Sequence, residues 1–376
     1  MRKGDAMDQE NYRLAVQLRH ELHQHPELSM HETWTKSRLM DFLHCHTNLK
    51  LVDKGRWFYA VHWAGEDKES IAFRADMDAV PVTDPPDFVP YVSQCPGVGH
   101  KCGHDGHSAA LAAFGLELDR RDTEKNVFLL FQHAEETGQG AVECLEMLTE
   151  HNISEIYAFH NLPGVSLGAV AVPEGVAQFA STGMILQFTG VKSHASYPEN
   201  GRNPAFAIGE MITEIPKLIQ PEQYRGMALI TVIQVDVGER AFGTSAGYGE
   251  LLLTLRAEFE EELEQLRKRL ESLAQEKAAI YGLGCSFSYE DPFPETRNHP
   301  QSVAKVRQAA EQLGVPVEEM KERFRASEDF GHYTKQIPGT MFYLGAGDSA
   351  PLHTEQFDFP DQLIETAVDL FLQLAQ

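Results

Sequence analysis

One cysteine and three histidines lie within the eight residues 100–107, HKCGHDGH. Thiolates and imidazoles are strong ligands for divalent transition metals, and here Cys102 and His104 are two residues apart. The segment is expected to form a glycine-rich turn just before a helix. Two side chains that are two residues apart in such a turn can face one ion, because alternate side chains of an extended segment share a side. The segment therefore predicts metal binding. The alternative is a buried structural cysteine beside surface histidines.

Two adjacent carboxylates, Glu135 and Glu136, follow the apolar run VFLLF at 127–131. If that run is a strand of a parallel sheet, both lie at the edge where ligands bind in such folds. One carboxylate could then bind a metal ion while the other acts as a general base. The alternative is the solvated start of a helix.

Two further histidines lie where strands are expected to end. His160 closes the apolar segment 154–160, and His353 follows the segment 340–347. Each histidine alone is typical of a surface loop. Together with the two earlier segments they supply nitrogen, sulfur and oxygen donors near several strand ends, and this joint pattern indicates one shared metal site.

Strand and helix patterns alternate along the first half of the chain. Apolar spacing over 10–46 predicts two helices, separated at His25-Pro26. Strands are expected at 57–63, 70–75, 127–132 and 154–160, with helices at 107–119 and 139–150. This alternation predicts an α/β domain with a mostly parallel sheet.

The pattern changes at about Ala180 and returns to α/β after Tyr289. Between them the expected order is strand, helix, strand, strand, helix, strand, which is typical of a ferredoxin-like domain. We therefore predict a catalytic domain formed by residues 1–178 and 290–376. Residues 179–289 are predicted to form a second domain inserted into the first.

The composition excludes several classes of protein. The 376 residues contain 32 Lys and Arg against 56 Asp and Glu, and the net charge of −24 disfavours a nucleic-acid partner. No apolar stretch is long enough for a membrane helix, and the first residues have no export signal, so we expect a cytoplasmic protein. Five scattered cysteines argue against a disulfide framework.

The chain resembles the M20 metallopeptidase superfamily, specifically the amidohydrolase branch that includes hippurate hydrolases, N-acyl amino acid amidohydrolases and auxin-conjugate hydrolases. The resemblance spans nearly the whole chain and implies a phosphorylase/hydrolase-like α/β domain with an inserted ferredoxin-like lid. In this branch the lid is often the dimer interface, so a homodimer is expected. The matching segments are 18–32, 73–82, 100–111, 129–141, 160–170, 193–198, 326–333 and 351–359.

The resemblance also implies a site that holds two divalent metal ions per subunit, Zn²⁺ or Mn²⁺, with Co²⁺ or Ni²⁺ as alternatives. Glu135 would be the general base and would later protonate the leaving amine. Asp78 would orient a metal ligand, with a structural turn as the alternative. The implied ligands are Cys102, His104, Glu136, His160 and His353.

Two residues of the inserted domain are expected to contact substrate. His194 matches a histidine that polarises the scissile carbonyl in relatives, often in the partner subunit's active site. Arg256 could clamp a substrate carboxylate or pair with nearby acids. Relatives commonly have Asp-Pro where this chain has Asn203-Pro204, Asn-Val-Ile-Pro at 244–247, and proline in place of His133. These differences leave the identity of the acyl amino acid substrate open.

Together these features predict a dinuclear-metal amidohydrolase that cleaves N-acyl amino acids into a carboxylic acid and an amino acid. One alternative is a metal-dependent exopeptidase or dipeptidase, distinguished by tolerance of a free α-amine. The other is a catalytically silent metal-binding scaffold of the same fold. Against the scaffold, the general-base position is still glutamate and all five ligand positions are filled.

Overall fold

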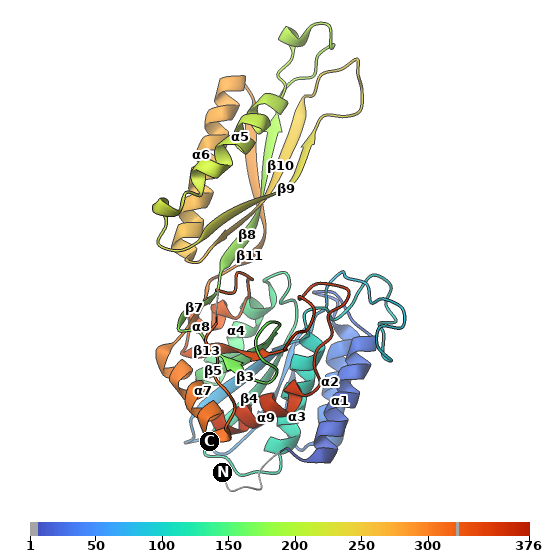
Figure 1. Cartoon of the computed structure of the whole chain (residues 1–376), viewed down its shortest axis with the longest axis vertical. Coiled ribbons are helices and arrows are strands. Elements are labelled where there is room, and N and C mark those ends of the chain that lie inside the picture. The colour runs from blue at the N-terminus through green and yellow to red at the C-terminus, as the bar shows by residue number, and fades with distance from the viewer. Residues whose placement is uncertain (1–6, 321–322) are drawn as a thin grey trace. The chain divides into compact units, whose positions relative to one another are not determined.

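The computed structural model describes residues 7–320 and 323–376, and the chain divides into two compact units (Figure 1). The first unit comprises Met1–Ala177, Thr296–Arg323 and Asp329–Gln376, and the second comprises Gln178–Glu295 and Phe324–Glu328. The second unit extends past the expected end at residue 289 because its last strand continues to Phe293.

The first unit is built on a seven-stranded sheet with the order β1-β2-β4-β3-β5-β13-β6. Its four inner strands, β4, β3, β5 and β13, are mutually parallel, whereas β1, β2 and β6 pair antiparallel. The parallel centre confirms the predicted α/β class. The strands are β1 Lys50–Asp53, β2 Phe58–His62, β3 Ser70–Asp76, β4 Asn126–Gln132, β5 Ile153–Leu162, β6 Val170–Ala171 and β13 Gly339–Gly345.

Side chains of these strands alternate between two apolar layers. Phe73 and Leu129 pack into the layer formed with α1, α2, α3, α7 and α9, while Ala72 and Phe128 pack into the layer formed with α4 and α8. Burial on both faces explains why these strands are continuous apolar runs. The helices are α1 Gln9–Gln24, α2 Thr33–His46, α3 His104–Leu118, α4 Gly140–Glu150, α7 Pro300–Leu313, α8 Gly331–Thr334 and α9 Leu363–Leu374.

The parallel strands bring chemically active residues to one edge of the sheet. Asp76 ends β3 and pairs in register with Gln132, which ends β4. Glu135 and Glu136 follow β4 directly, and His160 lies near the end of β5. The carboxyl edge of the sheet therefore carries the residues that the sequence singled out.

The second unit has the expected β-α-β-β-α-β order, with its strands in the sheet order β11-β8-β10-β9. All three strand pairs are antiparallel. The leucine spacing over α6 predicts one apolar face made by Leu263, Leu266, Leu270 and Leu273. The first three are buried in the core of this unit, and Leu273 packs against it partly buried. The elements are β8 Ala180–Thr189, α5 Ala205–Leu218, β9 Ala228–Val237, β10 Tyr248–Ala257, α6 Glu260–Tyr281 and β11 Gly284–Phe293.

The remaining elements are short. Strands β7 (Gly175–Gln178) and β12 (Thr296–Asn298) pair with each other, and single 3-10 turns lie at Pro198–Asn200 and Pro221–Gln223. In the part of the chain that the structure describes, every helix is too short or too polar to cross a membrane.

Candidate metal centre

Cys102 and His104 lie on either side of a tight turn at the start of α3. Gly103 between them has a φ of +101°, a left-handed conformation that glycine adopts without strain. A Cβ at this position would lie 2.2 Å from Oδ1 of Asn161, so a side chain cannot be accommodated. The segment is thus a turn that enters a helix, and His104 is its first helical residue. The sequence predicts a glycine-rich turn before a helix here, and the structure has that turn, although the helix begins at His104 and not at residue 107.

The structure brings the five sequence-predicted ligands together. Their donor atoms form two overlapping groups, each with all atoms within 4.8 Å of one another. Cys102 Sγ lies 3.5 Å from His160 Nε2, and His353 Nε2 lies 3.3 Å from Glu136 Oε1. One group is Cys102, His104 and His160, and the other is Cys102, Glu136 and His353.

Two of these donor atoms are buried in a way that a cation would explain. Among the described residues, His104 Nε2 has no hydrogen-bond partner, and Glu136 Oε1 is not counted as hydrogen-bonded although it lies 3.3 Å from His353 Nε2. Buried polar atoms are ordinarily paired, because leaving one unpaired costs about 1–3 kcal/mol. His104 Nε2 lies 3.7 Å from Glu136 Oε1 and 3.9 Å from Glu135 Oε2. A thiol, imidazoles and carboxylates fit divalent transition metals, so these residues fit a metal ion.

Hydrogen bonds on the far side of each ring leave the facing nitrogen available. His104 Nδ1 lies 3.0 Å from the main-chain oxygen of Asp78 and 3.2 Å from its Oδ1. Because both partners are acceptors, Nδ1 carries a proton, and in the neutral imidazole the lone pair of Nε2 faces the cluster. His160 Nδ1 donates likewise to the main-chain oxygen of Asn161 at 2.8 Å. Asp78 therefore lies where the predicted orienting role requires it.

The electrostatics of the cluster favour a bound cation. Burial disfavours a charged His104, but Asp76 and Asp78 raise the pKa of its imidazole to about 10. Burial, followed by the charges of Glu136 and Glu135, raises the pKa of the Cys102 thiol well above its usual range. Several carboxylates thus surround Cys102 and His104, and this negative charge favours a bound cation.

His353 is held differently from the other four candidate ligands. Its side chain is 49% exposed, and its backbone is left-handed with a φ of +59°. The main-chain N–H of His353 donates to the main-chain oxygen of Lys101 at 2.7 Å. This bond joins the loop that carries His353 to the turn that carries Cys102, so both donors are fixed together.

Sequence reasoning missed a buried hydrogen-bonded chain behind His104. Arg74 Nη1 donates to Asp76 Oδ2 at 2.6 Å, and Asp76 Oδ1 accepts from His107 Nδ1 at 2.7 Å. His107 Nε2 lies 2.6 Å from Oδ1 of Asn161. Both ring nitrogens of His107 are thus occupied within the protein. The sequence signal for Arg74 was a charged residue near the end of the apolar run that forms β3.

A second buried network lies beneath the turn and was also missed. Lys101 pairs with Asp84 and donates to the main-chain oxygen of Phe357 at 2.9 Å. His23 Nε2 lies 3.0 Å from Asp84 Oδ2, and its Nδ1 lies 2.8 Å from Asp105 Oδ2. The sequence signal for this network was the segment 18–32, which resembles the family but was not assigned a function.

This network predicts a pH-dependent stability. Burial favours neutral His23, but its hydrogen bonds to Asp105 and Asp84 raise its pKa to about 9, against about 6.5 when unfolded. The protonated imidazole therefore stabilises the fold fully below about pH 6.5, and this contribution disappears as pH rises through 9. The free energy of unfolding decreases by at most about 3 kcal/mol when this proton is lost. The charged or titratable groups around it are Arg19, Asp84, Tyr91, His100, Asp105 and Asp358.

Urea unfolding of the wild type and of His23→Gln at pH 6.5, 8 and 9.5 measures this effect. We expect the stability difference between the two proteins to shrink as pH rises, because residue 23 loses a proton over this range in the wild type but not in His23→Gln. A difference that stays constant with pH would show that His23 does not titrate in this window.

The predicted substrate residues lie in the second unit. His194 is exposed, and its Nδ1 accepts a hydrogen bond from the N–H of Ser196 at 3.1 Å. Arg256 donates to the main-chain oxygen of Arg325 and to Ser327 Oγ, both at 2.6 Å, in place of the acids considered for it. Burial lowers the pKa of Arg256.

Two of the three sequence departures, Asn203 and 244–247, lie in the second unit with His194, whereas His133 lies in the first. His194 and Thr244 form an isolated antiparallel bridge, and Ser193 N donates to Ser245 Oγ at 2.9 Å. Asn203 Oδ1 accepts from the N–H of Ala205 at the start of α5, at 2.9 Å. The altered 244–247 segment therefore fixes the backbone of the loop that carries His194.

Comparison with known proteins places the chain in a family. The family model described as peptidase family M20/M25/M40 matches residues 72–376. The chain belongs to the M20/M25/M40 peptidase family. The sequence-based assignment to the M20 superfamily is thereby confirmed.

Individual relatives extend this result over nearly the full chain. An N-acetylcysteine deacetylase from Bacillus subtilis (strain 168) is 27% identical over 375 residues, which is 96% of this chain and 95% of the relative. An uncharacterized hydrolase from Staphylococcus aureus (strain bovine RF122) is 28% identical over 370 residues, 95% of this chain and 96% of the relative. A solved dinuclear metal binding peptidase of the M20 family from Bacillus subtilis is 25% identical, covers 98% of both chains and has a TM-score of 0.83.

This M20 protein is thus a hydrolase with the mixed α/β fold of its family, and the general activity is that of an amidohydrolase. Its candidate metal site groups cysteine, histidine and carboxylate donors at the carboxyl edge of the parallel strands.

Proposed function

We propose that this M20 hydrolase is a dinuclear-metal amidohydrolase that cleaves N-acyl amino acids into a carboxylic acid and an amino acid. The observation that carries the proposal is the pair Glu135 and Glu136 beside the unpartnered Nε2 of His104. Glu136 belongs to the group with Cys102 and His353, and Glu135, whose side chain is 6% exposed, lies within reach of His104 and Glu136. This is the arrangement that a ligand and a general base need.

The donor geometry supports two ions. Cys102 belongs to both three-atom groups, so its sulfur can serve both. We propose Zn²⁺ or Mn²⁺ as the bound ions, with Co²⁺ and Ni²⁺ as alternatives that also suit such donors. When bound, such ions acidify water and polarise a carbonyl oxygen.

Glu135 performs the proton transfers. Its carboxylate takes a proton from the water that attacks the acyl carbon, and the new C–O bond forms as the C–N bond weakens. The same carboxyl group then gives that proton to the amine nitrogen as the C–N bond breaks. The products are a carboxylic acid and a free amino acid, and Glu135 returns to its starting state.

The substrate class rests on the relatives. One of them is named an N-acetylcysteine deacetylase, and N-acetylcysteine is an N-acyl amino acid. The exposed His194 and the clamp candidate Arg256 are proposed to contact substrate in a dimer formed through the second unit.

The test is a hydrolysis screen with N-acetyl and N-benzoyl amino acids beside unblocked dipeptides. The protein is stripped with a chelator and reloaded with Zn²⁺, Mn²⁺ or Co²⁺ in turn, and released amino acid is measured. We expect metal-dependent release from the blocked substrates. Release from unblocked dipeptides alone would make the protein an exopeptidase, and no release with two bound metals would identify a silent scaffold.

A further inference from the structure

The turn that carries Glu135 is tightly constrained. Ala134 has a φ of +48°, which is unusual for a residue with a side chain. The main-chain oxygen of Ala134 accepts hydrogen bonds from the N–H groups of Gln139 and Gly140, at 3.2 and 3.1 Å. A Cβ on Gly140 would lie 1.6 Å from the main-chain oxygen of His133, so the turn leaves no room there.

Two buried carboxylates hold the N–H groups on either side of Glu135. The N–H of Ala134 donates to Glu32 Oε1 at 2.6 Å, and the N–H of Glu136 donates to Asp78 Oδ2 at 2.9 Å. Glu32 is 4% exposed and Asp78 is fully buried. The main chain is therefore anchored at the residue before and the residue after Glu135.

Both anchors connect to one N-terminal segment, residues 27–32. Ser29 Oγ donates to Asp78 Oδ2 at 2.7 Å, and the N–H of Ala79 donates to the main-chain oxygen of Glu27 at 2.8 Å. The segment is thus bonded to the Asp78 loop and, through Glu32, to the Glu135 turn. It lies outside the range matched by the family model, which begins at residue 72.

Helix capping does not account for Glu32. It occupies the N-cap position of α2, yet its side chain makes no capping hydrogen bond. Glu27 satisfies the start of α2 instead, because its carboxylate accepts from the N–H groups of Trp34 and Thr35 at 3.1 and 2.9 Å. Burial and the charge of Asp78 raise the pKa of Glu32 to about 7, so its position is unfavourable for a carboxylate.

We propose that Glu32 is a positioning residue for the general base, which it fixes by accepting the N–H of Ala134 in its left-handed conformation. This inference rests on the proposed function, in which Glu135 is that base. Residues that hold a reacting group in place without touching substrate commonly change activity 10- to 100-fold when lost.

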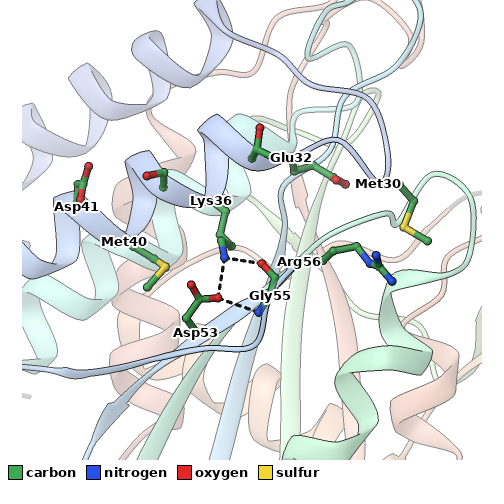
Figure 2. Close-up of a pocket in the computed structure, with 10 residues that line it drawn as sticks. Met30, Glu32, Lys36, Met40, Asp41, Asp53, Gly55 and Arg56 are labelled. Carbon is green, nitrogen blue, oxygen red and sulfur yellow. Dashed lines mark hydrogen bonds and ion pairs between the residues drawn. The ribbon is translucent and has the colours of Figure 1, made fainter.

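The surroundings of Glu32 make the test feasible. Glu32 lines a pocket together with Met30, Lys36 and Arg56, and Figure 2 shows these side chains around it. Water can reach the space left by a shortened side chain, so Glu32→Ala is expected to fold. Glu32→Gln keeps an oxygen that can accept the same hydrogen bond.

The experiment compares metal-loaded wild type, Glu32→Ala, Glu32→Gln and the control Glu27→Gln on the best substrate of the screen. We expect Glu32→Ala to lower kcat by about 10- to 100-fold with KM changed less than about twofold and the metal content unchanged. Glu32→Gln should recover most of kcat. Glu27→Gln, which alters only the cap of the same helix, should lower thermal stability and leave kcat unchanged.

Amide hydrogen exchange supplies a readout that needs no substrate. Exchange in a peptide that spans residues 127–141 should be faster in Glu32→Ala than in wild type and Glu32→Gln. Equal exchange, an unchanged kcat, or an equal loss of kcat in Glu27→Gln would overturn the inference. A wild type without turnover would reject the proposed function alone, because the exchange result would still decide whether Glu32 holds the turn.

Discussion

Glu135→Gln is expected to lower kcat by about 10²- to 10⁴-fold, the range that a general acid and base supplies. The amide has nearly the shape of the carboxylate but cannot take the proton from water. Because the proposed ligands are other residues, the variant should keep the wild-type metal content. Steady-state kinetics on the best blocked substrate, with atomic absorption for metal content, measure both quantities.

The neighbouring carboxylate is the control for this substitution. Glu136→Gln changes a proposed ligand, so it should lower metal content as well as kcat. Equal metal loss in both variants would assign Glu135 to metal binding, and a kcat within tenfold of wild type in Glu135→Gln would remove the general-base role.

Arg19→Met is expected to destabilise the first unit by about 3–5 kcal/mol, as removal of one partner from a buried ion pair usually does. Arg19 is fully buried on α1. Its guanidinium lies 3.3 Å from Asp105, 2.9 Å from Asp358 and 2.6 Å from Asp361. Burial opposes its charge, but these three carboxylates raise its pKa. Methionine would leave them without this cation.

The same change elsewhere on α1 gives a matched control. Arg13 pairs with Glu10 at 2.5 Å, but its side chain is 74% exposed, so Arg13→Met should change stability by less than about 0.5 kcal/mol. Thermal unfolding should show a midpoint lowered by roughly 6–20 °C for Arg19→Met and little change for Arg13→Met. Similar midpoints for the two variants would mean that the buried network contributes no net stability.

The sequence was most informative where one short segment contained a whole signal. The run VFLLF predicted β4 because a strand buried on both faces must be apolar at every position. The leucine spacing predicted the packed face of α6 for a similar reason, with three of its four leucines buried and Leu273 partly buried. The five candidate ligands were named from the family resemblance, and each lies in a distinctive motif close to the end of a strand or the start of a helix.

The supporting residues could not be predicted because their partners are distant in sequence. Glu32 contacts the N–H of Ala134, 102 residues away, and Ser29 contacts Asp78, 49 residues away. A main-chain partner leaves no pattern of residue types. The glycine-rich turn before α3 was predicted, but the collision with Asn161 that excludes a side chain at Gly103 is visible only after folding.

The position of β13 has a consequence for how the chain folds during synthesis. This strand lies inside the sheet between β5 and β6, yet it is the last strand in the sequence. The ribosome must add 183 residues after Leu162 before Gly345 completes the β5–β13 pair, which takes roughly 10–40 s at usual elongation rates. Throughout that interval β5 has an unpaired edge, so the nascent chain offers a long-lived site for chaperones or for aggregation.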